Sequence, residues 1–171
     1  MSIVLATQPP LFTDTETRST HVLGPVFFDL CNLRIEASTA PALPPSVIAP
    51  SNSPYIAASN ETFSASVDVH FNNSPLTRLL LCLGMKVEMQ FAFEGVGGRA
   101  IETDVTVSVV TVRNNFDYTL TWTGTAEDLK LTPGLYAIAA IANVSAHQHP
   151  CSQEVLGYGY MAARLLQVYP A

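Results

Sequence analysis

Charged residues are scarce in this chain. Asp, Glu, Lys and Arg make up only 13% of its 171 residues, about half of the roughly 25% that is usual in soluble domains. The eight Lys and Arg residues include no adjacent pair, and the net charge is −6. Nucleic-acid interfaces and polybasic membrane patches both need clustered cations. We therefore expect no nucleic-acid partner and no membrane partner.

Long apolar runs are also lacking. The longest, such as residues 79–83 and 135–141, fall far short of the roughly 20 residues that a helix needs to cross a bilayer. Residues 1–19 have no early Lys or Arg, and their apolar run at residues 3–6 is too short for the core of a signal peptide. These features predict a cytoplasmic protein.

Sequence motifs for catalysis are missing as well. The chain has three cysteines, Cys31, Cys82 and Cys151, an odd number where a secreted sandwich would more often carry an even set. Cys82 lies in an apolar run, which predicts an inert core thiol rather than a nucleophile. No G-x-S-x-G motif is present, and the glycine-rich segment 95–98 lacks the Lys and the following helix of a phosphate-binding loop. We expect no enzymatic activity and assign no catalytic residue.

What the chain does have is an alternation of apolar and polar residues with a period of two, which is typical of strands with one wet face. The expected strands span residues 21–36, 63–71, 87–93, 101–113, 116–123, 135–144 and 155–169. Residues 77–83 fit either a buried strand or a short helical turn. The sequence thus predicts an all-β fold, a two-sheet antiparallel β-sandwich of seven to eight strands.

Two local features refine this expectation. The apolar phase switches from Val109 to Val110 within residues 101–113, which predicts a β-bulge. The second feature is the segment Pro133-Gly134-Leu135-Tyr136. A Pro-Gly turn that opens into a Tyr-led strand is typical of a chain crossing between the sheets of a sandwich, with the Tyr hydroxyl bonded back to the turn. Pro133, Gly134 and Tyr136 are therefore expected to be structural residues.

Residues 60–169 resemble an immunoglobulin-like or fibronectin-type β-sandwich. The resemblance rests on the strands at 63–71 and 87–93 and on the corner Leu131-x-Pro-Gly-x-Tyr136-x-Ile138. The chain departs from antibody domains, because it has no Cys pair on facing strands and its only Trp falls on a different strand. A resemblance at this level implies an architecture and no particular function.

The predicted domain organisation is simple. Residues 1–20 are polar and irregular, which indicates a flexible N-terminal arm, and residues 21–171 form a single β-sandwich domain. Residues 37–59 contain five prolines, and proline lacks the N–H that a sheet ladder needs. We therefore expect a Pro-rich loop at 37–59.

His147, His149 and Cys151 form the strongest candidate for a metal site. In an extended segment these alternate residues share one face, and imidazole and thiolate suit Zn²⁺ or Cu²⁺. A fourth ligand, such as His70 or His21, would have to come from elsewhere. The alternative is a solvated loop with incidental histidines and no cofactor.

Aromatic residues suggest a second candidate site. Tyr158 and Tyr160 on the last strand, together with Trp122, could form a platform for a sugar or a peptide. The alternative is that Tyr158 and Tyr160 share one face of the strand and cover the edge of the core, because most aromatic residues on strands are packing residues.

The last strand, residues 155–169, is apolar almost throughout, with Arg164 as its only charged residue. Edge strands normally carry charge or Pro, so this strand is either central or covered by a second copy of the chain, and we expect a homo-oligomer.

The leading hypothesis is a non-enzymatic module of the bacterial cytoplasm for protein–protein interaction or self-assembly, with its protein partner unknown. The alternative is a sugar- or metal-binding module that uses residues 145–153.

Overall fold

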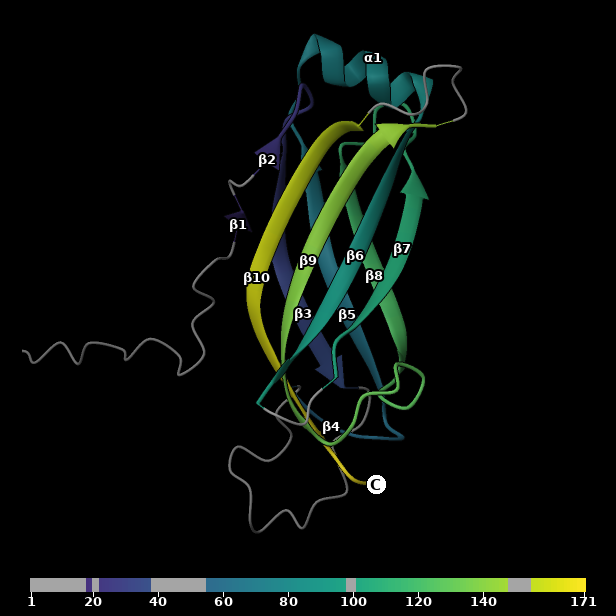
Figure 1. Ribbon diagram of the computed structural model, residues 1–171. Coiled ribbons are helices and arrows are strands. Elements are labelled where there is room, and N and C mark those ends of the chain that lie inside the picture. Colours follow the sequence, from purple (N-terminus) through teal and green to yellow (C-terminus); the bar gives the residue numbers. More distant parts are fainter. Residues whose placement is uncertain (1–17, 20–21, 38–54, 98–100, 148–154) are drawn as a thin grey trace, which may run out of the picture.

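In the described part of the chain, two stacked β-sheets form a sandwich, and one short helix lies across an end of the stack (Figure 1). The computed structural model describes residues 18–19, 22–37, 55–97, 101–147 and 155–171. The elements are β1 (Arg18–Ser19), β2 (Val22–Leu23), β3 (Phe28–Ala37), β4 (Ile56–Ala58), β5 (Thr62–Phe71), α1 (Pro75–Leu83), β6 (Met85–Val96), β7 (Thr103–Val110), β8 (Asp117–Thr125), β9 (Gly134–Ala146) and β10 (Val155–Tyr169).

The smaller sheet has four strands in the order β1-β3-β5-β8. The larger sheet has six strands, with the order β2-β10-β9-β6-β7 and β4 beside β10. Neighbouring strands are antiparallel except β4 and β10, which are parallel where Ile56–Ala58 meets Gln167–Tyr169. The predicted all-β fold of two sheets is confirmed, and the parallel pair corrects the expectation of a wholly antiparallel one.

The seven strands that are eight residues or longer correspond to the seven strands expected from the alternation. The three additional strands are only two or three residues long, too short to leave a period in the sequence. β1 falls inside the predicted N-terminal arm and pairs with β3. β4 falls inside the predicted Pro-rich loop at 37–59, so the described part of that segment includes a short strand.

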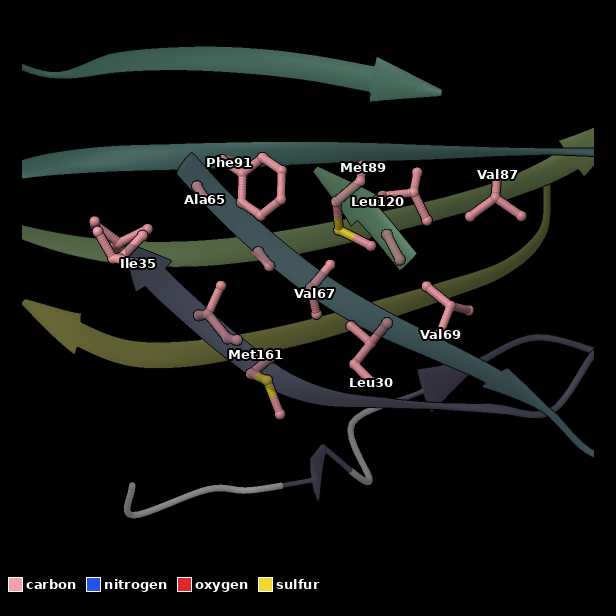
Figure 2. Close-up of a cluster of buried hydrophobic side chains, with 14 of the residues drawn as sticks. Leu30, Ile35, Ala65, Val67, Val69, Val87, Met89, Phe91, Leu120 and Met161 are labelled. Carbon is pink, nitrogen blue, oxygen red and sulfur yellow. The ribbon is translucent and has the colours of Figure 1, made fainter. Parts of the chain in front are cut away.

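Alternation along the strands builds the core between the sheets (Figure 2). Residues of one parity face inward from β5, β6 and β9, and their side chains are almost completely buried. Burial of these apolar groups is the main favourable contribution to folding. The largest fully buried side chains are Tyr136, Phe63, Phe71, Phe91, Phe93, Leu30, Ile35, Leu81, Met85, Met89, Ile138 and Met161.

The chain crosses from the four-stranded to the six-stranded sheet between β8 and β9, at Pro133 and Gly134. Tyr136, the third residue of β9, is completely buried. Its hydroxyl donates a hydrogen bond to the Thr132 carbonyl, with an O···O distance of 2.6 Å. The ring fills the corner while its polar tip satisfies a carbonyl of the turn.

Residues 75–83 form the helix α1, one of the two structures that the sequence allowed for 77–83. The Ser74 hydroxyl accepts a hydrogen bond from the Thr77 N–H at 3.1 Å, and Pro75 occupies the first turn, where no N–H is needed. Gly84 ends the helix at a φ of 83°. Cys82 is exposed on this helix, so the prediction that it is a core thiol is wrong: the helix turns position 82 away from the sheets.

The β-bulge expected near Val110 is not found. Pairing between β6 and β7 runs without a register shift from Phe93 to Lys86. β7 simply ends at Val110, and Val112 beyond it is exposed. The register shifts instead in β3 between Cys31 and Arg34 and twice in β10. The apparent phase change therefore reflects the end of a strand.

Candidate functional site

The predicted metal ligands are only partly placed by the structure. His147 follows β9, is half-buried, and its backbone N–H bonds to the Gly84 carbonyl at 3.2 Å. His149, Cys151 and His21 lie outside the described residues. His70 belongs to the other sheet and pairs through Nδ1 with the Asp117 carboxylate. Within the described ranges, no group of three or more His, Cys, Asp or Glu side chains is placed to hold a metal ion.

The three predicted aromatic ligand-binding residues are not brought together. Tyr158 and Tyr160 point outward from β10 and are 47% and 45% exposed. Trp122 lies on β8 of the other sheet and packs inward, 5.2 Å from the Phe63 ring and 6.1 Å from the Phe93 ring between centroids. Trp122 therefore packs against the core, and the two tyrosines lie on a separate surface.

The last strand has neighbours on both sides. β9 pairs along almost the whole of β10. On the other side, β2 pairs at Tyr158 and Gly159, and β4 pairs at Gln167–Tyr169. Short strands of the same chain thus cover parts of this edge, and β10 by itself no longer argues for a second copy.

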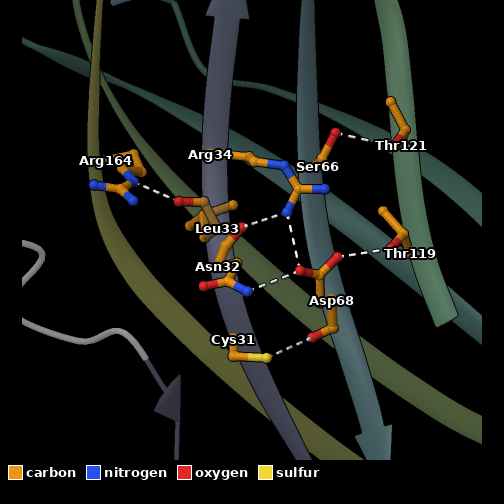
Figure 3. Close-up of polar contacts among 9 residues, drawn as sticks. All are labelled: Cys31, Asn32, Leu33, Arg34, Ser66, Asp68, Thr119, Thr121 and Arg164. Carbon is orange, nitrogen blue, oxygen red and sulfur yellow. Dashed lines mark hydrogen bonds and ion pairs between the residues drawn. The ribbon is translucent and has the colours of Figure 1, made fainter. Parts of the chain in front are cut away.

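Arg164 helps to close the flank of the sandwich at β10 (Figure 3). Its Nε donates a hydrogen bond to the Leu33 carbonyl of β3, in the opposite sheet. Its guanidinium lies 5.9 Å from the centre of the Tyr55 ring, within the range of a cation–π contact. A charged side chain therefore bridges the two sheets at this flank.

The opposite flank is formed by β7 and β8, one from each sheet (Figure 1). In the part of the chain that the structure describes, each is the last strand of its sheet. Apolar side chains at this flank pack on the core but stay only half-buried. They are Val105, Val107, Val109, Phe116 and Trp122. We call β7, β8 and these five side chains the open flank.

The edge strands of the open flank carry little of the usual protection against pairing. Lys, Pro or a bulge normally blocks an exposed edge. β8 has no charge or Pro from Tyr118 to Thr125, and β7 has one charged residue, Asp104. Both strands pair with their inner neighbours without a register shift. The open flank is therefore a template for a further strand.

Backbone groups on β8 face this flank at every second residue. The Phe71 N–H donates to the Phe116 carbonyl at 2.8 Å, and hydrogen-bonded pairs alternate along an antiparallel ladder. From the register, Tyr118, Leu120 and Trp122 direct their backbone groups to β5. The N–H and C=O groups of the intervening residues point to the open flank. These residues are Thr119, Thr121 and Thr123.

Side chains close this run at both ends. The Asp117 N–H donates to Asn115 Oδ1 at 3.3 Å, and the Thr125 N–H donates to Asp128 Oδ2 at 2.8 Å. The available stretch is thus short and defined. Sequence reasoning missed this edge because it searched for an apolar run, whereas the informative signal in residues 118–125 is the absence of charge.

A polar network covers the outer face of the four-stranded sheet, centred on Asp68 (Figure 3). One carboxylate oxygen accepts from Asn32 Nδ2 at 2.9 Å and Arg34 Nη1 at 3.1 Å, and the other accepts from Thr119 Oγ1 at 2.7 Å. A shallow groove of about 370 Å³ lies beside Asp68 and is bordered by Cys31, His70 and Asp117. Because protein donors already hold both Asp68 oxygens, this carboxylate ties three strands together.

The network also sets the protonation of Asp68. Burial raises the pKa of this carboxyl, but the hydrogen bonds from Asn32, Thr119 and Arg34, with the charge of Arg34, outweigh burial and hold the pKa below its ordinary 3.8. A carboxyl whose pKa is lower in the folded state stabilises the protein above its unfolded pKa. That stabilisation disappears as the pH falls through the folded pKa.

Replacing Asp68 with Asn should therefore give a pH-dependent loss of stability. At pH 7 we expect the free energy of unfolding to fall by about 1 kcal/mol, the size of a net hydrogen bond at a partly exposed position. The gap between wild type and Asp68→Asn should close as the pH falls below 3.8. Urea denaturation over a pH series measures it, and a gap that stays constant down to acid pH would contradict this assignment.

One exposed apolar surface lies away from the open flank. Leu76, Leu79 and Leu83 of α1 are 46%, 56% and 62% exposed, and their spacing places them on one side of the helix. α1 lies across the end of the sandwich that is remote from β4 (Figure 1). These leucines make the end of the molecule apolar, but they offer no backbone groups for pairing.

Within the described ranges, the structure contains no helix that is long and apolar enough to cross a membrane. The candidate site is the open flank, where two edge strands with few charged residues lie beside half-buried apolar side chains. No model of a known protein family and no curated protein matches this chain.

Proposed function

We propose that this protein is a non-enzymatic β-sandwich module that binds a protein partner or assembles with itself through the open flank. The observation that carries the proposal is the contrast between the two flanks. Arg164, β2 and β4 cover the flank at β10. β7 and β8 form an opposite flank with no protective charge, Pro or bulge along most of their length.

Strand addition suits this surface physically. An added strand would form main-chain hydrogen bonds with an edge, which is how extended segments bind to exposed sheets in many complexes. The same strand would cover apolar side chains that the sandwich leaves half-buried, among them Val107 and Trp122. The low charge content of the whole chain, 13%, is consistent with part of its surface lying in an interface.

We also propose that the sandwich is immunoglobulin-like in its topology. Of the seven longer strands, the first, second and fifth share one sheet, and the third, sixth and seventh share the other, as strands A, B, E and C, F, G do in immunoglobulin domains. Tyr136 near the start of the sixth strand supports this assignment, because the tyrosine corner of those domains occupies the same place. The fourth strand, β7, pairs beside the third.

Light scattering coupled to size-exclusion chromatography tests the proposed function. At micromolar concentration we expect a mass greater than that of one chain. Lysines at the outward positions Thr106 and Thr121, one on each edge of the open flank, should return the mass to that of a monomer, because edge charges oppose strand pairing. Gln167→Lys, which adds one lysine at an exposed position on β10, is the control and should keep the wild-type mass. A wild-type chain that remains strictly monomeric would rule out self-assembly.

A further inference from the structure

The edge of β8 is self-complementary, and this identifies a partner for it. Resting on the proposed function, we infer that two copies of this chain pair through β8 in antiparallel fashion, with a two-fold axis at Thr121. The four-stranded sheets of the two copies would then join into one continuous sheet. Such an interface is isologous, so the same patch serves both partners and the assembly closes as a dimer.

The backbone of β8 selects the position of the axis. The N–H and C=O groups of Thr119, Thr121 and Thr123 point to the open flank, as the register with β5 requires. A two-fold axis at Thr121 places Thr121 opposite its own copy and Thr119 opposite Thr123 of the second copy. All three pairs are then of the hydrogen-bonded kind, so every outward backbone group in the stretch is matched.

The ends of the stretch restrict the register to this one. The N–H groups of Asp117 and Thr125 are already bonded to the side chains of Asn115 and Asp128. A shift of the axis by half a residue would place outward-facing residues opposite inward-bonded ones and leave the threonine groups unmatched. A shift by one residue keeps outward groups opposite each other but sets one of the three threonine residues opposite Asp117 or Thr125, whose N–H is already bonded.

Side chains on both faces are compatible with this pairing. On the outer face, threonine would meet threonine, a favourable cross-strand combination. On the inner face, Leu120 would lie opposite Trp122 of the second copy, and Trp122 is only half-buried in the single chain. Asp117 would lie opposite Thr125 rather than another carboxylate, so no like charges meet.

The edge of β7 fits a second copy less well. Its outward residues are Asp104, Thr106, Ser108 and Val110. A two-fold axis at Val107 would set the Asp104 carboxylate, which already accepts a hydrogen bond from Gln90 Nε2 at 2.8 Å, opposite the exposed side chain of Val110. This mismatch of charge and apolar surface favours β8 as the site of self-pairing.

A charge exchange at position 121 tests the inference, because the axis brings this residue against its own copy. Thr121→Lys alone and Thr121→Glu alone should each raise the dimer dissociation constant by at least about tenfold, since like charges then lie directly opposite. An equimolar mixture of the two variants should restore the dimer as a heterodimer. Sedimentation velocity measures all three samples, with Gln167→Lys as the control that keeps wild-type dimerisation.

Amide hydrogen exchange gives a second measurement on the wild-type chain. The Thr121 N–H should exchange more slowly as the protein concentration rises, whereas the N–H of Thr106 on β7 should not change. If both single variants form dimers as stable as those of the wild type, the β8 pairing is overturned. The chain would then assemble through β7 or another surface. A mixture that stays monomeric would overturn the two-fold register. A wild-type chain that is monomeric throughout would overturn both this inference and self-assembly.

Discussion

Replacing Tyr136 with Ala should lower the free energy of unfolding by about 3–5 kcal/mol, the usual cost of removing a large buried ring. The Tyr136 side chain is completely buried at the crossing between the two sheets. Its hydroxyl donates to the Thr132 carbonyl at 2.6 Å. The substitution therefore leaves a cavity in the core and also removes the bond that holds the turn against β9.

The conservative variant separates these two contributions. Tyr136→Phe keeps the ring and loses only the hydrogen bond, so we expect a loss of about 1 kcal/mol. Tyr158→Ala removes an identical side chain that is 47% exposed and should change stability by about 0.5 kcal/mol or less. Urea denaturation monitored by Trp122 fluorescence measures all three. A Tyr136→Ala protein as stable as wild type would show that the corner does not stabilise the fold.

The second large effect is expected at Gly159 of β10, which faces the core. A Cβ atom there would lie 2.7 Å from Cε2 of Phe28 and 3.0 Å from Cδ1 of Leu30. Both neighbours are inward-facing residues of β3 in the opposite sheet, with Leu30 completely buried. Gly159→Val should therefore cost about 1–3 kcal/mol, because the inserted atoms force a packed ring or the backbone to move.

A double substitution tests this cause directly. Phe28→Leu removes the ring atoms that the new side chain would meet, so Gly159→Val combined with Phe28→Leu should lose less stability than the sum of the single changes. Leu165→Val alters an exposed residue of the same strand and should have almost no effect. Losses that simply add would show that steric contact with Phe28 is not the cause.

The same close packing explains why function is expected at the flank opposite β10. Phe28 packs against Gly157 and Gly159, and Arg164 bonds to Leu33, so β3 and β10 are joined by contacts that reach across the sandwich. β7 and β8 have apolar side chains at the corresponding positions of their flank, and these remain half-buried. Because contacts within the chain close the flank at β10, the flank at β7 and β8 is where pairing with a further strand can lower the free energy of the assembly.

Local pattern was enough to predict the long strands. Alternation such as that of Phe63 to Phe71 arises because successive residues on a strand point to opposite faces, and β5 spans Thr62–Phe71. Residues 135–144 are apolar on both faces, which is typical of a central strand, and β9 lies between β10 and β6. The Pro133-Gly134 turn before Tyr136 indicated a crossing, and the chain changes sheets there.

Where two local structures fit equally, the sequence left the choice open. Residues 77–83 are apolar at almost every position, so their periodicity does not distinguish a strand from a helix. The helix forms because Ser74 caps it and Pro75 suits its first turn, and because Thr77 and Leu81 are the residues that become buried. The exposure of Cys82 follows from that choice.

Tertiary structure alone decided which strands are edges. An edge is defined by partners that are distant in the chain, and β10 gains β2 and β4, which are separated from it by about 100 residues or more and are too short to show a period. Trp122 alternates with exposed threonines along β8. It contacts Phe93 because the second sheet packs against this face of β8. The sequence specified strands and a corner because these depend on neighbouring residues, whereas the open flank depends on long-range pairing.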